Sequence, residues 1–171
     1  FKKLFAEIGD EQNIIQSLST FSSHIKNLKN ILDNVDDETF ILIDEIAAGT
    51  DPKEGASLAK AILEEFVNKG ALSITSTHFN ELKSLPFDNT SFQNGSVDFD
   101  IETLKPTYKL RLGIPGASNA FAIAKNFGIN EELITSAKNH YEKNITEESK
   151  LLETLQQKYS ELNKLTQETQ E

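Results

Sequence analysis

The sequence predicts an α/β fold with a parallel sheet, a small antiparallel extension, a C-terminal helical pair and a projecting, coiled-coil-like terminal helix. Two observations predict the parallel sheet. The segments 39–44 and 71–75 have the length of strands, and the segment between them, 53–68, has the apolar spacing of a helix. Strand, helix and strand in this order form a βαβ unit, whose two strands run parallel.

The first helix is predicted over residues 19–34, with Ser19 or Thr20 at its start. Its apolar residues are spaced by three and four: Phe21, Ile25, Leu28, Ile31 and Leu32. Residues 1–18 are mixed in character and predict no clear element. Strand 39–44 is apolar at consecutive positions, which is typical of a strand covered on both faces.

Asp51 and Pro52 are predicted to open the helix over 53–68, because Asp is a favoured cap and Pro suits the first helical position. Glu54, three residues after Asp51, completes the pattern of a capping box. Gly70 ends the helix, and the strand 71–75 follows it.

The second half of the chain has a different pattern. Residues 91–99 and 107–112 alternate between apolar and polar, which predicts a small antiparallel meander. Two short helices are expected over 118–127 and 131–142. In the last segment, 145–170, apolar residues recur at coiled-coil steps: Leu152, Leu155, Tyr159 and Leu162.

Composition restricts the class of protein. The chain has 171 residues, no cysteine and a net charge of −10. The missing cysteines exclude disulfides and thiolate metal sites, and the acidic charge argues against unaided binding to nucleic acid. No apolar run approaches the ~20 residues of a membrane span, so we expect a cytoplasmic protein without a membrane partner. The chain begins at Phe1 and contains no methionine, and we expect it to be a piece of a longer protein.

Polar side chains follow both predicted parallel strands. Asp44 and Glu45 follow the first, and Thr77 and His78 follow the second. Ligands of parallel α/β sheets bind at the carboxyl ends of the strands. Carboxylates there suit Mg²⁺, and a neighbouring carboxylate can orient or deprotonate water.

These motifs resemble an ABC-type ATPase. The strand 40–45 is similar to a Walker B strand, residues 48–51 to the loop after it, and residues 76–78 to the segment with the switch histidine. The stretch 16–24, with Ser-Thr-Phe, resembles the signature of the MutS family. Residues 48–56 are most similar to its second bacterial branch, so the expected fold is part of a P-loop NTPase sheet of ABC/MutS type.

The resemblance implies two cofactors and three residue roles. ATP and Mg²⁺ would be bound, with Asp44 holding the metal through water. Glu45 would position or activate the hydrolytic water, and His78 would contact the γ-phosphate region. A solvated strand end and a structural histidine are the alternative interpretations of these residues.

The resemblance also implies a homodimer with composite sites. Ser19 and Thr20 would reach the partner's nucleotide, and Asp51 would communicate between the two sites. The alternatives are helix capping by Ser19 or Thr20 and by Asp51, and capping is compatible with the implied roles.

The phosphate-cradling motif Gly-x-x-x-x-Gly-Lys-[Ser/Thr] does not occur in this sequence, where none of the eight glycines precedes a lysine. We therefore expect the 171 residues alone to bind ATP weakly or not at all and not to hydrolyse it.

The expected organisation is the C-terminal part of the ATPase domain (1–116), a helical dimerisation pair (117–142) and a helical linker (143–171). The resemblance implies an ATP-controlled clamp on branched or recombination DNA or on stalled ribosomes, with a nuclease domain outside this chain. The alternatives are a mismatch-repair MutS, an SMC-like ATPase, and a non-catalytic dimerisation scaffold.

Several other polar and aromatic residues have structural interpretations. His24 and His140 are predicted to have surface or packing roles, and the acidic cluster in 33–38 is predicted to be a solvated turn rather than a cation site. An aromatic and aliphatic group forms either a local core or a partner surface: Phe121, Ile123, Phe127 and Ile129.

Overall fold

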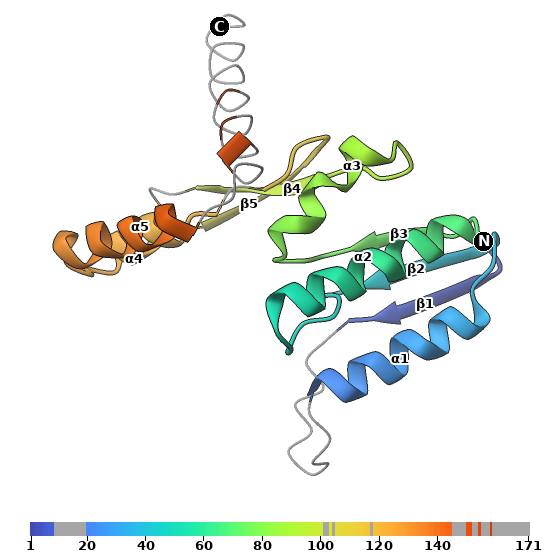
Figure 1. Cartoon of the computed structure of the whole chain (residues 1–171). Helices are drawn as coiled ribbons and strands as arrows, with labels where there is room; N and C mark the ends of the chain where they lie inside the picture. Colours follow the sequence, from blue (N-terminus) through green and yellow to red (C-terminus); the bar gives the residue numbers. More distant parts are fainter. Residues whose placement is uncertain are drawn as a thin grey trace, which may run out of the picture. The chain divides into compact units, whose positions relative to one another are not determined.

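The predicted parallel sheet is present in the computed structural model of the chain (Figure 1). The structure describes residues 1–8, 20–100, 103, 105–116, 118–144, 150, 151, 154 and 158. The chain divides into two compact units, Phe1–Leu85 and Pro86–Glu171. The first unit contains the parallel sheet and the candidate site.

Three parallel strands form the sheet of the first unit, in the order β1-β2-β3. Its elements are β1 (Lys3–Glu7), α1 (Thr20–Asn34), β2 (Thr39–Ile43), α2 (Pro52–Asn68), β3 (Leu72–Thr75) and the 3₁₀ helix η1 (Asn80–Ser84). The predicted helices and strands from residue 19 to residue 75 are thus confirmed. Strand β1 and helix η1 were not predicted.

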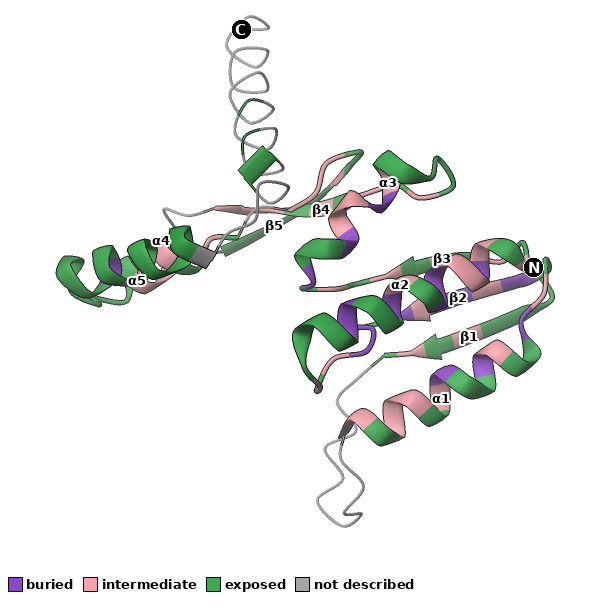
Figure 2. Cartoon of the chain, in the orientation of Figure 1, coloured by how far each residue is buried: buried purple, intermediate pink, exposed green. Residues whose placement is uncertain are grey.

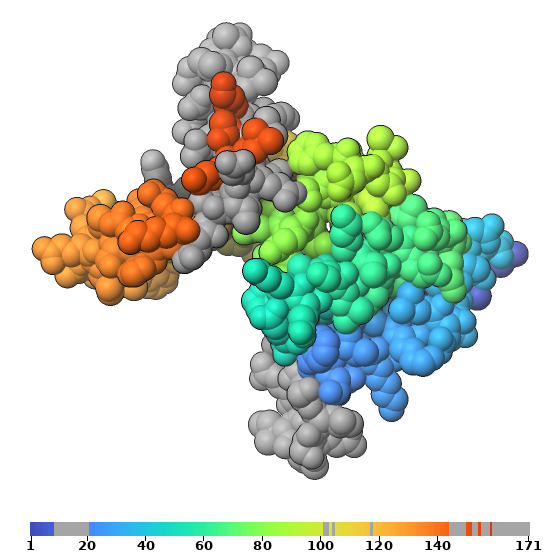
Figure 3. Space-filling view, in the orientation of Figure 1, coloured from blue at the N-terminus to red at the C-terminus, as the bar shows by residue number. Residues whose placement is uncertain are grey.

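Helices α1 and α2 pack on one face of this sheet, since the two successive crossovers between parallel strands have the same hand (Figure 1). Figure 3 shows the two helices side by side, where they largely hide the sheet behind them. The core between helices and sheet is apolar and fully buried at its centre (Figure 2); it includes Leu28, Ile31, Ile41, Ile43, Ala59, Ile62 and Phe66.

The sequence predicted that β2 is covered on both faces, and this is wrong for the face opposite the two helices. Strand β2 alternates between buried and half-buried residues, rather than being buried at every position. On the half-buried face, Leu4 of β1 is 64% exposed and Ile74 of β3 is 62% exposed. Strand β2 therefore has apolar residues at positions that the described residues leave only half-buried.

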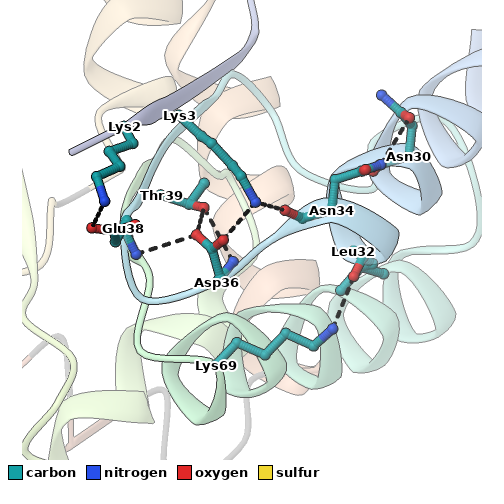
Figure 4. Close-up of polar contacts among 9 residues, drawn as sticks. All are labelled: Lys2, Lys3, Asn30, Leu32, Asn34, Asp36, Glu38, Thr39 and Lys69. Carbon is teal, nitrogen blue, oxygen red and sulfur yellow. Dashed lines mark hydrogen bonds and ion pairs between the residues drawn. The ribbon is translucent and has the colours of Figure 1, made fainter.

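An ion pair fixes the start of β1 to the turn before β2 (Figure 4). The Lys3 ammonium lies 2.5 Å from Asp36 Oδ2 and also donates to the carbonyl oxygen of Asn34. The buried Thr39 hydroxyl donates to Asp36 Oδ1 at 2.6 Å. The hydrogen bond from Lys3 and then that from Thr39 lower the pKa of Asp36 to about 2. The acidic turn is thus held by a lysine, in agreement with a structural role.

The second unit begins within the short helix α3 (Leu85–Asp88) and contains β4 (Gly95–Asp100), β5 (Lys105–Leu112), α4 (Ala120–Asn126) and α5 (Glu131–Asn144). The antiparallel pair β4-β5 and the helical pair confirm the predictions for this region. The strand predicted from residue 91 begins only at Gly95, because Asn89 accepts hydrogen bonds from the backbone N–H groups of Ser91 and Phe92 and forms a turn there. Helix α3 was not predicted.

The predicted coiled-coil seam lies outside the described residues. Among the described residues, no helix is both long enough and apolar enough to cross a membrane.

The Asp36 contacts predict an acid-dependent part of the stability. Because the pKa of Asp36 is lowered in the folded chain, its contribution is present above the ordinary value of 3.8 and is lost as the pH falls through about 2. We expect Asp36→Asn to flatten the loss of stability in this range, as measured by urea unfolding at several pH values. Asp37→Asn, which changes a neighbouring carboxyl outside this set of contacts, is the matched control. Equal pH dependence in wild type and Asp36→Asn would contradict the assignment.

The cap of α2 predicts a second stability effect. Asp51 Oδ1 accepts hydrogen bonds from the backbone N–H groups of Lys53 at 3.0 Å and Glu54 at 3.1 Å. Asp51→Ala should lower the free energy of unfolding by about 1 kcal/mol, whereas Asp51→Asn, which keeps an acceptor, should lower it much less. Urea unfolding of both variants tests this, and an equal loss in the two would show that capping is not the cause.

Candidate functional site

The acidic pair Asp44-Glu45 directly follows β2, the central strand of the parallel sheet. Both residues are exposed, whereas the strand before them and Ile46 and Ala47 after them are buried or half-buried. Because β2 and β3 are neighbouring parallel strands, their carboxyl ends meet at the same edge. The sequence prediction that Asp44, Glu45 and the residues after β3 share one edge is confirmed.

Ser76, the first residue after β3, forms hydrogen bonds with this acidic pair. Its hydroxyl donates to Asp44 Oδ1 and accepts a hydrogen bond of 2.9 Å from the backbone N–H of Glu45. Its carbonyl oxygen accepts from the backbone N–H of Ile46 at 3.3 Å. One serine therefore fixes one carboxylate and the backbone of the next two residues.

His24 of α1 also forms a hydrogen bond with this turn. Its Nε2 lies 3.1 Å from the backbone nitrogen of Ala47, and its Nδ1 lies 3.1 Å from Glu7 Oε1. Glu7, the last residue of β1, also accepts a hydrogen bond of 3.1 Å from the Asn27 side chain. The carbonyl oxygen of Glu7 accepts from the backbone N–H of Asp44 at 2.8 Å. The turn after β2 is thus tied to both β1 and α1.

Two residues of this turn have an unfavourable backbone conformation. Glu45 has φ +53° and Ala47 has φ +55°, a left-handed region that costs roughly 1–3 kcal/mol for each such residue. The backbone N–H of Ala48 closes the turn on the Glu45 carbonyl oxygen at 3.1 Å. Every backbone N–H from Asp44 to Ala48 therefore has an acceptor. These hydrogen bonds hold Glu45 and Ala47 in their unfavourable backbone conformation.

The loop after the acidic pair packs closely on its surroundings. Gly49 has φ +91°, and a Cβ added there would lie 3.6 Å from Phe21 Cβ of α1. A Cβ added at Gly55 of α2 would lie 2.8 Å from the Phe79 ring and 3.0 Å from the Ala47 carbonyl oxygen. Glycine at position 55 allows α2 to approach the turn. The turn and the loop after it therefore pack against both α1 and α2.

His78 lies beyond the end of β3 and is exposed. Its ring packs against the ring of the buried Phe79, with centroids 4.7 Å apart. The backbone N–H of Phe79 is capped by the Thr77 hydroxyl at 3.0 Å. The His78 imidazole thus packs against Phe79 on one side and is open to solvent, so it can contact a ligand at this edge.

The other predicted site residues are distributed as follows. Asp51 caps α2, so its predicted structural role is confirmed. Thr20 is the first residue of α1, and Ser19 lies outside the described residues.

Ser76, Glu7 and His24 were not predicted to belong to the site. The packing role predicted for His24 agrees with its partly buried position, but its hydrogen bonds to Glu7 and Ala47 were not predicted. Ser76 was predicted only to belong to the motif that contains His78. Its place directly after a strand, beside a polar motif, was the one available signal.

The donor set at this edge suits a partly hydrated hard cation. Two exposed carboxylates and a hydroxyl provide oxygen ligands of the kind that Mg²⁺ prefers, and Mg²⁺ usually takes only one or two carboxylates, with water and phosphate oxygens completing its shell. Within the described ranges, no group of three or more metal-binding side chains forms a cage. The residues present therefore fit a metal shared with a phosphate ligand better than a metal held by protein alone.

Known proteins similar to this chain identify its family. The family model described as MutS domain V matches residues 1–169. The chain is 50% identical over 157 residues to Endonuclease MutS2 of Halalkalibacterium halodurans, and 51% identical over 158 residues to Endonuclease MutS2 of Clostridium beijerinckii. Each alignment covers 92% of this chain and 20% of the relative, so the chain spans about one fifth of these proteins. The chain belongs to the MutS domain V family.

Proposed function

We propose that this chain supplies the carboxylate half of an ATP-hydrolysing site in a longer MutS-type protein. The observation that carries the proposal is the strained turn Asp44–Ala48, in which every backbone N–H is bonded while the two carboxylates remain exposed. A turn of this kind holds charged groups in fixed positions for a ligand.

Asp44 is the proposed metal-holding residue. One of its oxygens accepts from Ser76, which orients the carboxylate and leaves the other oxygen for a metal-bound water. When bound, Mg²⁺ would neutralise phosphate charge as the bond to the γ-phosphate breaks. The contribution of this chain is to hold the carboxylate in place.

Glu45 is the proposed residue that orients or deprotonates the attacking water. Its backbone is fixed by Ser76, and its side chain belongs to the exposed edge rather than to the core. His78, whose ring packs against Phe79 after the neighbouring strand, would donate to a γ-phosphate oxygen.

The rest of the site would come from elsewhere. This sequence contains no phosphate-loop motif, so the backbone cradle and its lysine would lie in another part of the full protein. Thr20, the first residue of α1, and Ser19, which precedes it in the sequence, would meet the nucleotide of a partner subunit, because a helix amino terminus has free N–H groups that suit an anion. Asp51 would link the two sites of the homodimer, in addition to capping α2.

The proposed activity of the full protein follows from its relatives. Those named Endonuclease MutS2 are about five times as long as this chain, and we propose that the nuclease lies in a part of the full protein outside it. We propose that the full protein is an ATP-controlled clamp, with branched DNA or stalled ribosomes as its substrates. In this proposal residues 1–116 belong to the ATPase domain, 117–142 to a dimerisation pair and 143–171 to a linker.

The helical pair of the second unit favours a dimerisation role for that region. Phe127, which follows α4, is 77% exposed, and Leu133 of α5 is 61% exposed. By contrast, Phe121 packs against Tyr141 with ring centroids 5.9 Å apart. Phe121 therefore belongs to a local contact of the helical pair, whereas Phe127 and Leu133 are exposed apolar residues that a second subunit would cover in this proposal.

The proposal predicts the effect of removing the water-orienting carboxylate. In the full-length protein, Glu45→Gln should lower the kcat of ATP hydrolysis by about 10²- to 10⁴-fold while nucleotide is still bound, since only the catalytic step loses its base. Steady-state hydrolysis and equilibrium binding of an ATP analogue measure the two effects. Glu54→Gln, a similar change in the first turn of α2, is the control.

Two results would contradict the proposal. One is a wild-type kcat in Glu45→Gln. The other is ATP turnover by the 171-residue chain alone that Glu45→Gln abolishes, because the chain without a phosphate loop is expected to be inactive.

A further inference from the structure

We propose that His24 is a positioning residue for ATP hydrolysis, which holds the Ala47 backbone and thereby the turn that carries Glu45. The inference rests on the proposed function of Asp44 and Glu45. It adds a residue of α1 to that site, although His24 would touch neither the nucleotide nor the water.

The hydrogen bonds around His24 select one form of its ring. The backbone N–H of Ala47 can only donate, so the nitrogen that faces it at 3.1 Å, Nε2, must carry a lone pair. The proton of the neutral ring then lies on Nδ1, 3.1 Å from Glu7 Oε1, where it is donated to the carboxylate. The contact between His24 and Glu7 is therefore a hydrogen bond that fixes a tautomer.

The surroundings hold this arrangement in place. The side chains of His24 and Glu7 are only 13% and 18% exposed. Asn27, one turn further along α1, donates to the same Glu7 oxygen at 3.1 Å and so restrains the carboxylate. Histidine, asparagine and glutamate thus form a partly buried unit between β1, α1 and the turn.

The bond to Ala47 acts on the strained part of the turn. Ala47 is buried and has φ +55°, and Glu45, two residues earlier, has φ +53°. Without His24 as the acceptor, the backbone N–H of Ala47 would be unsatisfied. The strained turn would then relax and move Glu45. A displacement of about 1 Å in a catalytic group can lower a rate by about 10²-fold.

The position of His24 also connects two sites. It lies four residues, or about one helical turn, after Thr20, the first residue of the helix proposed to meet the partner's nucleotide. A movement of α1 caused by the partner's nucleotide would therefore be transmitted through one hydrogen bond to the turn that carries this subunit's Glu45.

The test uses the full-length protein and three variants. In His24→Ala the kcat should fall about 10- to 100-fold with unchanged binding of an ATP analogue. His24→Gln should recover most of the rate, because its amide oxygen can replace Nε2 as the acceptor. Lys29→Ala, at an exposed position of the same helix, should retain the wild-type rate.

A second measurement follows the bond itself. Hydrogen exchange of the peptide that contains Ala47, measured by mass spectrometry, should be faster in His24→Ala and near the wild-type rate in His24→Gln. Glu7→Leu should also accelerate it, because the ring then loses the acceptor that fixes its tautomer.

The outcomes separate this inference from the function on which it rests. A wild-type protein without ATPase activity overturns the proposed function and the inference with it. An active wild type whose kcat is unchanged by His24→Ala overturns the inference alone. Equal loss of kcat in the Ala and Gln variants, in parallel with loss of folding stability, also overturns it, since His24 would then be only a packing residue.

Discussion

The turn Asp44–Ala48 depends on hydrogen bonds to its backbone from three different elements. The end of β1 binds the first N–H, Ser76 after β3 binds the next two, and His24 of α1 binds the fourth. The turn itself closes the last N–H on its own carbonyl oxygen. A segment with two left-handed non-glycine residues persists only when its surroundings compensate for the strain, and here β1, α1 and the residue after β3 provide that compensation.

The fold leaves two carboxylates, Asp44 and Glu45, exposed at the end of a strand whose residues are buried or half-buried. The buried Ile46 and Ala47 anchor the turn in the core directly beyond the acidic pair, and Gly55 permits α2 to pack against the Ala47 carbonyl oxygen. Asp44 and Glu45 thus combine exposed side chains with a rigid backbone. Such rigidity is what electrostatic catalysis requires, because charged groups that need not reorganise stabilise a transition state most effectively.

Much of the local structure could be predicted from the sequence because its signals are local. The Asp51-Pro52 start of α2 and the apolar spacing of α1 predicted these helices correctly, and the order strand, helix, strand predicted the parallel sheet. Strand β1 was missed because its five residues are mostly exposed and lack both a clear alternation and a turn signal before them.

The shared edge of the exposed polar side chains could be predicted from the sequence, whereas the groups that hold them could not. Asp44, Glu45 and His78 follow strands, so their shared edge could be inferred from order along the chain. The bonds of His24 reach partners 17 and 23 residues away, and those of Ser76 reach partners 31 and 32 residues away. Such contacts depend on register and packing, which sequence periodicity does not specify.

A structure of the full-length protein with Mg²⁺ and a non-hydrolysable ATP analogue tests whether the turn Asp44–Ala48 belongs to an ATP-hydrolysing site. We expect the γ-phosphate at the carboxyl edge of β2 and β3, with Asp44 reaching the metal through water and the Glu45 backbone in the left-handed conformation of this turn. Ser19 and Thr20 of a second subunit should lie against the same nucleotide. A nucleotide bound away from Asp44 and Glu45, or a turn that changes its backbone conformation on binding, would contradict the account.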